Sequence, residues 1–364
     1  MGAPLRSETL TRKPRGFCTD PVRVMIVDDS LTVRTVFSRM IKQEHDMVIV
    51  GTANTAEAGL SDLPGAAPDV MMLDLEMPGM GGLEALPKIM EIAPKTKVLV
   101  ISSLTADGAE STVKALSLGA ADTMLKPRPG GFDDDYKAGL LGKIRALKGL
   151  PPEETEQAAP SSANAPQVGK PPQAIAIGAS PGGIHALNLF LRQVPQNFDL
   201  PILVTQHLPA SFIPVFAQQM EMAGTRPAVL ADEGTVIERG KIYIAPGHGH
   251  MVVRKAGGRR VIGLAYHPVK SGCMPSVDPM FETLAEAYDG HVSGVLLSGM
   301  GRDGTDGAQA LLSAGGTMFA QNAETCAVWG MPRAISEMGL AAAVLPPAEL
   351  ADALLDSVGA DAWR

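Results

Sequence analysis

DVMMLDLEMP, at residues 69–78, is a short apolar run that ends in acidic residues, and a helical pattern follows it near 83–92. The same alternation of strand and helix patterns occurs five times between residues 22 and 148. This repetition predicts an open, five-stranded parallel sheet with helices on both faces. The expected strands lie in 22–30, 47–53, 69–78, 97–103 and 121–127, and the expected helices near 31–43, 55–63, 83–92, 106–118 and up to 148.

A second α/β pattern follows further along the chain. AIAIGAS (174–180) predicts a strand that leads into a helix, and PILVTQH (201–207) predicts the next strand and another helix. Residues 252–267 predict a hairpin around two glycines. Strand-rich segments are expected before the hairpin, up to 241–250. After the hairpin we expect a helix at 279–289, a strand at 291–301, a further helix, a strand at 317–321 and a last helix near 348–357. This half of the chain is expected to be a doubly wound, mostly parallel α/β domain.

Residues 149–172 separate the two halves by composition. They contain six prolines, little aliphatic material and no aromatic residue, and such a segment cannot bury enough apolar surface to offset its ordering entropy. We therefore expect a proline-rich linker at 149–172 between domains at 21–148 and 173–364. Residues 1–20 are expected to be a disordered tail.

The bulk composition excludes several classes of protein. The formal net charge of −8 disfavours a general nucleic-acid binder, which usually carries a basic face. Cys18, Cys273 and Cys326 are scattered, so a disulfide framework or a structural zinc site is not expected. The chain has no bilayer-spanning apolar run and no secretory signal pattern. These observations predict a cytoplasmic protein without membrane insertion or a nucleic-acid partner.

Functional side chains follow the predicted strands of the first domain. Asp28 and Asp29 follow the first strand, Asp74 ends the third, Ser102 ends the fourth and Lys126 follows the fifth. Sites in open α/β sheets form at the carboxyl ends of the strands. Crowded carboxylates need a cation, and oxygen ligands suit Mg²⁺. Asp74 is then expected to accept a phosphoryl group, while Lys126 and Mg²⁺ stabilise its charge and Ser102 contacts its oxygens.

The first domain resembles the response-regulator receiver family, which has a flavodoxin-like fold. The matching pieces are VDDS (27–30), MMLDLEMPGMGG (71–82), VISS (100–103) and LKP (125–127). The resemblance implies that a histidine kinase phosphorylates Asp74. It also implies that Asp29, Asp74 and the carbonyl of Glu76 bind Mg²⁺, with Asp28 behind them. Thr123 departs from the family, which usually has an aromatic residue there, so we expect a switch that works through Ser102 alone or is damped.

IGASPGG (177–183) in the second domain ends a strand and opens a helix. Ser180 can act there as a nucleophile, with backbone N–H groups of the turn receiving an oxyanion. A helix N-cap is the alternative role for Ser180. A dinucleotide loop is disfavoured because the spacing is not GxGxxG and the next strand ends in Gln206 and His207 instead of an acid.

His207 ends the strand that should neighbour Ser180, so it can accept the serine proton. A carboxylate is then needed to orient the imidazole. The loop LLSGMGRDGTDG (296–307) offers Asp303 and Asp306, and spacing alone does not choose between them. The order Ser, His, Asp differs from that of α/β-hydrolases.

IGAS–GG, TQH, YIAPG–H, PSVD and LSGMG–DG together resemble the catalytic domain of the protein-glutamate methylesterases of chemotaxis, the CheB type. The resemblance runs from about residue 173 to 360. It implies that Ser180 is the nucleophile, His207 the general base and Asp303 the orienting acid, with the N–H of Met300 in the oxyanion hole. Pro181 departs from the threonine common in the family.

The two resemblances together predict a phosphorylation-activated hydrolase. It would remove methyl groups from glutamate methyl esters of chemoreceptors and deamidate their glutamines, with no cofactor at the hydrolytic site. Two alternatives stay open: a phospho-switched receptor-binding module without turnover, and an esterase for small-molecule substrates. For His248 and His250 we favour a loop-shaping role over a zinc site, and for Cys273 and Cys326 a packing role.

Overall fold

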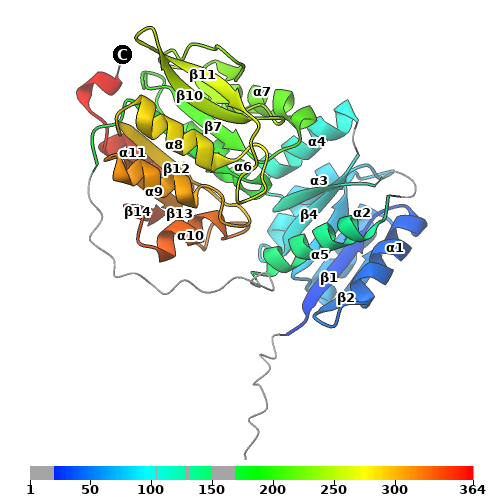
Figure 1. Cartoon of the computed structure of the whole chain (residues 1–364). Helices are drawn as coiled ribbons and strands as arrows, with labels where there is room; N and C mark the ends of the chain where they lie inside the picture. The colour runs from blue at the N-terminus through cyan, green and yellow to red at the C-terminus, as the bar shows by residue number, and fades with distance from the viewer. Residues whose placement is uncertain (1–19, 104, 128–130, 150–168, 364) are drawn as a thin grey trace, which may run out of the picture.

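The structure, a computed structural model, describes residues 20–103, 105–127, 131–149 and 169–363. It contains two α/β units, each built on its own parallel sheet (Figure 1). The expected tail at 1–20 and linker at 149–172 fall almost entirely outside the described residues. The predicted fold class is confirmed for both units.

The first unit is a five-stranded sheet in the order β2-β1-β3-β4-β5, and every neighbouring pair is parallel. Its central strand β3 is buried at all five positions because helices cover both faces of the sheet. The order reverses between β1 and β3, so their carboxyl ends open a crevice there. Its elements are β1 Val22–Val27, α1 Leu31–Lys42, β2 Met47–Ala53, α2 Ala56–Ala66, β3 Val70–Asp74, α3 Gly82–Ile92, β4 Lys97–Ser102, α4 Ala106–Ser117, β5 Asp122–Leu125 and α5 Asp134–Lys148.

The second unit is a seven-stranded parallel sheet in the order β14-β13-β12-β6-β7-β9-β8. The predicted hairpin is present as the antiparallel pair β10–β11, which lies against α8. The strands are β6 Ala174–Ala179, β7 Ile202–Gln206, β8 Ala228–Leu230, β9 Ile242–Ile244, β10 His250–Ala256, β11 Arg259–Ala265, β12 Val292–Leu296, β13 Thr317–Gln321 and β14 Ala343–Leu345. The helices are η1 Pro181–Gly183, α6 Ile184–Gln193, η2 Ala210–Phe212, α7 Ile213–Gly224, α8 Val277–Ala287, α9 Thr305–Ser313, α10 Met331–Glu337, α11 Pro347–Asp356 and η3 Ala360–Ala362.

Two features of this unit differ from the sequence prediction. The strand expected at 291–301 stops at Leu296, and a loop follows in which Gly301 and Gly304 take positive φ angles of 82° and 87°. These left-handed conformations turn the chain back into α9. The seven-residue helix α10 and the three-residue strand β14 were not predicted, because elements this short carry too little periodicity to be recognised.

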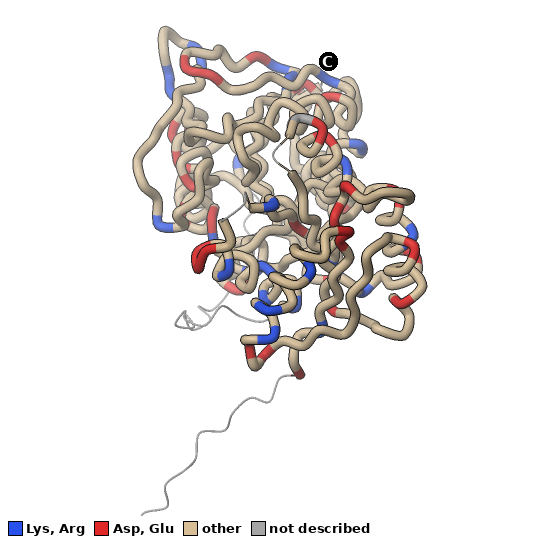
Figure 2. Tube along the Cα trace, turned by 90° about the vertical axis from the view of Figure 1, so that its right-hand side faces the viewer, with Lys and Arg blue, Asp and Glu red and all other residues tan. Residues whose placement is uncertain are grey.

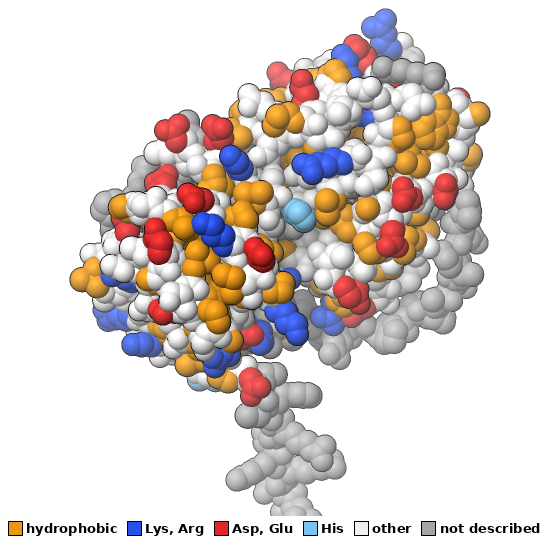
Figure 3. All heavy atoms as spheres, turned by 180° about the vertical axis from the view of Figure 1, so that it is seen from behind, with side chains coloured by type: hydrophobic (Ala, Val, Ile, Leu, Met, Phe, Trp, Pro, Cys, Tyr) orange, Lys and Arg blue, Asp and Glu red, His pale blue; other side chains and the backbone are white. Residues whose placement is uncertain are grey.

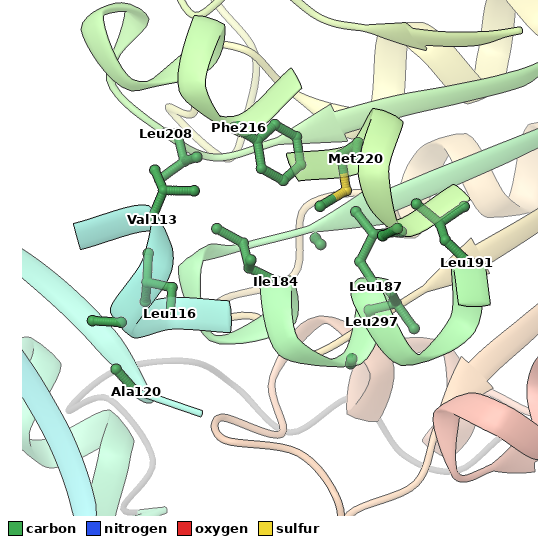
Figure 4. Packing of buried hydrophobic residues seen from close by; sticks show 14 of the residues in the cluster. Val113, Leu116, Ala120, Ile184, Leu187, Leu191, Leu208, Phe216, Met220 and Leu297 are labelled. Carbon is green, nitrogen blue, oxygen red and sulfur yellow. The ribbon is translucent and has the colours of Figure 1, made fainter. Parts of the chain in front are cut away.

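The two units pack directly on each other through α4 of the first and α6, α7 and η2 of the second. Figure 4 shows the apolar side chains of Val113 and Leu116 from α4 facing Ile184, Leu208 and Phe216, all of which belong to one continuous buried cluster. Interdigitated burial of this kind stabilises the contact by removing apolar surface from water.

Polar contacts add specificity to this interface. Ser117 at the end of α4 donates its hydroxyl to Gln219 Oε1 at 2.5 Å, and its carbonyl oxygen is 2.7 Å from Nδ1 of His185. Lys97 donates from Nζ to the carbonyl of Cys326 at 3.1 Å. The two units are therefore held in one defined orientation.

The charged residues of the described chain are mixed in sign. Lysine and arginine alternate with aspartate and glutamate along both units (Figure 2). On the face opposite to that of Figure 1, hydrophobic side chains lie between charged ones of both signs (Figure 3). Such a surface differs from the continuous basic face of nucleic-acid binders. Among the described helices, none is both long and apolar enough to cross a bilayer.

Candidate catalytic and phosphoryl-accepting sites

Three neighbouring strands of the second sheet bring the predicted catalytic side chains together. Ser180 directly follows β6, His207 follows β7, and Asp303 lies in the loop after β12. The strands are adjacent in the order β12-β6-β7, and the sheet order changes direction at this point. The carboxyl ends of such strands meet at one edge, where the fold leaves a crevice for a ligand.

The three side chains form a hydrogen-bonded relay. Ser180 Oγ lies 2.8 Å from His207 Nδ1, and His207 Nε2 lies 2.7 Å from Asp303 Oδ2. With a neutral imidazole, the serine hydroxyl donates to Nδ1 while Nε2–H donates to the carboxylate. Asp306, the other acid that spacing left open, instead pairs with Lys270 at 2.5 Å. The arrangement can transfer a proton from the hydroxyl to the imidazole.

Ser180 also occupies the N-cap position of η1, with Pro181 in the first turn. Its side chain nevertheless makes no capping hydrogen bond, because the hydroxyl points to His207. A residue that served only as a cap would direct its oxygen to the N–H groups of the turn.

Gly299 lies against the hydroxyl of Ser180. A Cβ at this position would stand 2.9 Å from Ser180 Oγ and 2.3 Å from Met331 Sδ, so a larger residue would have to displace these side chains. The next residue, Met300, has a backbone N–H with no hydrogen-bond partner among the described residues. An unpaired N–H one residue from this close approach is a candidate donor for an oxyanion hole.

Asp303 is held by residues that the sequence analysis did not single out. Its Oδ1 accepts hydrogen bonds from the hydroxyls of Ser276 at 2.5 Å and Ser271 at 2.9 Å. Its Oδ2 also accepts from the backbone N–H of Val277 at 2.7 Å. Ser276 lies in the PSVD motif directly before α8, and a serine before a helix is a sequence signal for a polar contact of its hydroxyl.

His250 supports this arrangement from behind. Its Nδ1 accepts from the backbone N–H of Ser276 at 3.0 Å, so its Nε2 carries the hydrogen and donates to the carbonyl of His267 at 2.9 Å. The side chain is fully buried. Both ring nitrogens are therefore used in shaping the loop, in line with the role we expected in place of a zinc site.

The electrostatics of the relay follow from burial and from the paired charges. Burial disfavours the charged imidazole, but the hydrogen bond to Asp303, with a contribution from Cys273, outweighs it and raises the pKa of His207 to about 9. Burial likewise acts against the ionised Asp303, yet its hydrogen bonds to His207 and Ser276 lower its pKa to about 2. Asp303 thus favours the imidazolium that forms when Ser180 loses its proton.

A cavity of about 900 Å³ lies over the relay, and both units line it. The second unit contributes Ser180, His207 and Met300, while the first contributes Thr123 from β5 and Lys126 directly after it. The contact between units is close there, because a Cβ on Gly182 would stand 2.3 Å from the carbonyl oxygen of Ala121. In this arrangement the first unit forms one wall of the crevice.

The predicted phosphoryl-accepting residues meet at the crevice of the first sheet. Lys126 Nζ lies 2.5 Å from Asp74 Oδ2 and 3.7 Å from Asp28 Oδ2. Burial raises the pKa of Asp74, although Lys126 and the N–H of Glu76 act in the opposite direction. Ser102 is buried at the end of β4, and its hydroxyl is 3.5 Å from that of Thr123.

The donor set of this crevice fits Mg²⁺. Oxygen atoms of Asp28, Asp29 and Asp74 lie within 4.8 Å of one another. Oδ2 of Asp28 is buried without a hydrogen-bond partner, although Lys126 Nζ lies 3.7 Å away, and a metal ion or water can complete the coordination of such an oxygen. Glu76 follows directly, with its N–H donating to Asp74 Oδ1 at 3.0 Å. Hard oxygen ligands in a partly open site suit Mg²⁺ with bound water.

Comparisons with known proteins find relatives for both halves of the chain. Residues 175–354 match the family model described as CheB methylesterase, and residues 24–131 match the response regulator receiver domain. The chain is 43% identical to protein-glutamate methylesterase/protein-glutamine glutaminase 2 of Caulobacter vibrioides, over 89% of this chain and 95% of that protein. It is 36% identical to the corresponding protein of Azospirillum brasilense, over 91% of each.

A solved structure gives the same result for the second unit. The CheB methylesterase catalytic domain of Thermotoga maritima superposes with a TM-score of 0.50 at 34% sequence identity. The match covers 51% of this chain and 99% of that structure.

Proposed function

The chain belongs to the CheB methylesterase family with an N-terminal receiver domain, and from this premise we propose that it demethylates and deamidates chemoreceptors under control of phosphorylation. The substrates are glutamate methyl esters, which yield glutamate and methanol, and receptor glutamines, which yield glutamate and ammonia. A histidine kinase supplies the phosphoryl group, and the reaction takes place in the cytoplasm.

Ser180 begins the reaction by attacking the γ-carbonyl carbon of the substrate. His207 Nδ1 accepts the serine proton, and Asp303 stabilises the resulting imidazolium. The tetrahedral intermediate places its negative oxygen near the N–H of Met300. His207 then returns the proton to the leaving methoxide or amide nitrogen, which departs as methanol or ammonia.

Water completes the turnover. His207 removes a proton from the water that attacks the acyl-enzyme carbonyl, and it returns that proton to Ser180 as the ester bond breaks. The products are a receptor glutamate and free enzyme. An amide substrate passes through the same intermediates, which accounts for both activities at one site.

Phosphorylation is proposed to act through the wall that the receiver contributes to the cavity. Mg²⁺, held by Asp29, Asp74 and the carbonyl of Glu76 with Asp28 behind them, would neutralise the charge of the transferring phosphoryl group. Lys126 pairs with Asp74 and also lines the cavity over Ser180 and His207. A phosphoryl group on Asp74 would draw in Lys126 and Ser102 and shift the equilibrium toward a state in which the receiver no longer covers the crevice.

The observation that carries this proposal is the relay of 2.8 Å and 2.7 Å contacts through Ser180, His207 and Asp303 at the receiver-lined cavity. It is tested by methanol release from methyl-labelled receptor membranes, with and without Mg²⁺ and a small phosphodonor. We expect release that rises with the phosphodonor. Asp74→Asn removes the rise, and Ser180→Ala removes the release.

The controls separate this function from its alternatives. A folded protein that releases no methanol under any condition, yet binds receptor membranes equally well with and without Ser180, would favour a binding module. Hydrolysis of short esters by a protein that leaves methylated receptor unchanged would favour a small-molecule esterase.

A further inference from the structure

We propose that Cys273, His207 and Asp303 form a binding site for a thiophilic divalent cation such as Zn²⁺, and that the bound metal inhibits the hydrolase. The inhibitory part rests on the proposed function, because it assumes that the relay through His207 performs the hydrolysis. The binding part rests on the geometry alone.

The three side chains offer a zinc ligand set at one point. An imidazole nitrogen, the thiol sulfur and a carboxylate oxygen lie within 4.8 Å of one another. Sulfur, nitrogen and oxygen ligands bind Zn²⁺ at about 2.0–2.3 Å, so the three atoms need to approach by on the order of an ångström. This set differs in kind from the all-carboxylate site of the receiver, which suits Mg²⁺.

The cysteine is held in place by the same network that holds the carboxylate. The backbone N–H of Cys273 donates to the hydroxyl of Ser271 at 3.3 Å, and that hydroxyl donates to Asp303 Oδ1 at 2.9 Å. Metal-ligating carboxylates are commonly fixed by such outer hydrogen bonds. Cys273 is partly exposed and lines the cavity, so an ion can reach it.

Binding at His207 necessarily interrupts the proton relay. Nδ1 contacts Ser180 and Nε2 contacts Asp303, so a metal bond to either nitrogen replaces a contact that catalysis uses. The thiol loses its proton on binding, and a neutral imidazole that coordinates through Nε2 keeps its hydrogen, now on Nδ1. The thiol proton passes to solvent, and no oxidant or reductant takes part.

Two measurements test the proposal on the full-length protein in excess Mg²⁺, which occupies the receiver carboxylates. Titration with Co²⁺ reports binding, because a thiolate ligand produces a charge-transfer absorption band. The rate at which the phosphodonor-activated protein hydrolyses methylated receptor, measured at increasing Zn²⁺ concentrations, reports inhibition. A zinc-selective chelator gives the metal-free reference. The variants are Cys273→Ser and, as the matched loss of another thiol, Cys18→Ser.

We expect the thiolate band in the wild type and in Cys18→Ser, and its loss in Cys273→Ser. The same variant should hydrolyse substrate when the chelator is present. Its half-inhibition should need at least about 100-fold more Zn²⁺ than that of the wild type. A band of equal strength in all three proteins would overturn the site. Zinc binding that leaves hydrolysis unchanged would overturn the inhibitory role. A protein that shows the band but never hydrolyses would contradict the proposed function and leave the metal site standing.

Discussion

Replacing Ser276 with alanine should slow hydrolysis while leaving all three relay residues in the chain. The Ser276 hydroxyl donates to Asp303 Oδ1 at 2.5 Å, and both groups are buried. A hydrogen bond to a buried charge contributes about 1.5–3 kcal/mol. If the whole contribution is lost in the transition state, kcat/KM falls by about 10- to 150-fold.

Ser276 has a second role that the assay must separate from this one. It is the N-cap of α8, where its hydroxyl accepts from the N–H of Asp278 at 3.3 Å. Loss of a cap lowers the free energy of unfolding by about 1 kcal/mol. Thr55→Ala is the matched control, because Thr55 caps α2 in the receiver and accepts from Ala58 N–H at 3.2 Å, away from the relay.

The measurement is kcat/KM for the phosphodonor-activated protein, together with thermal unfolding of each variant. Both variants should lose the stability that the cap contributes, Ser276→Ala should lose that of the Asp303 hydrogen bond in addition, and only Ser276→Ala should lose activity. Ser271→Ala, which removes the longer 2.9 Å contact to the same oxygen, should have a smaller effect. A Ser276→Ala protein that is folded and within twofold of wild-type activity would show that the Ser276 hydroxyl does not support catalysis.

Three further predictions follow from the same structure. Hydrolysis needs a neutral His207, so kcat/KM should rise with pH and level off only above the raised pKa of His207, about 9. A pH profile of kcat/KM with its midpoint near the ordinary pKa of 6.5 would contradict the effect of Asp303 on this histidine. Leu116→Ala should weaken the contact between the units, since such truncations cost about 2–5 kcal/mol, and raise activity without phosphodonor. Leu140→Ala, on the buried face of α5 in the receiver core, should destabilise the receiver without this rise, and equal activation by both would count against the interface. Asp28→Asn should lower the rate of Mg²⁺-dependent phosphorylation by at least tenfold, because it removes a buried carboxylate oxygen that has no protein hydrogen-bond partner. The rate is measured with labelled phosphodonor, and an unchanged rate would show that this oxygen is not part of the metal site.

Much of this protein could be predicted from local patterns in its sequence. Hydrophobic periodicity is a local property, so it identified the five strands and helices of the receiver and the main strands of the second unit. Parallel strands bring their carboxyl ends to one edge. For that reason the positions of Asp74, Ser180 and His207 at strand ends already indicated two sites.

Other features of the sites depend on loops and on contacts between distant segments, so they are set by the tertiary structure. Spacing did not distinguish Asp303 from Asp306, because the turn through Gly301 and Gly304 sets which carboxylate meets His207. The support of that carboxylate by Ser276 joins residues 27 positions apart. Contacts between distant segments also place receiver residues in the wall of the cavity and bring Cys273 close to His207. No local pattern encodes these contacts, since they depend on how two separately folded sheets and their loops pack in three dimensions.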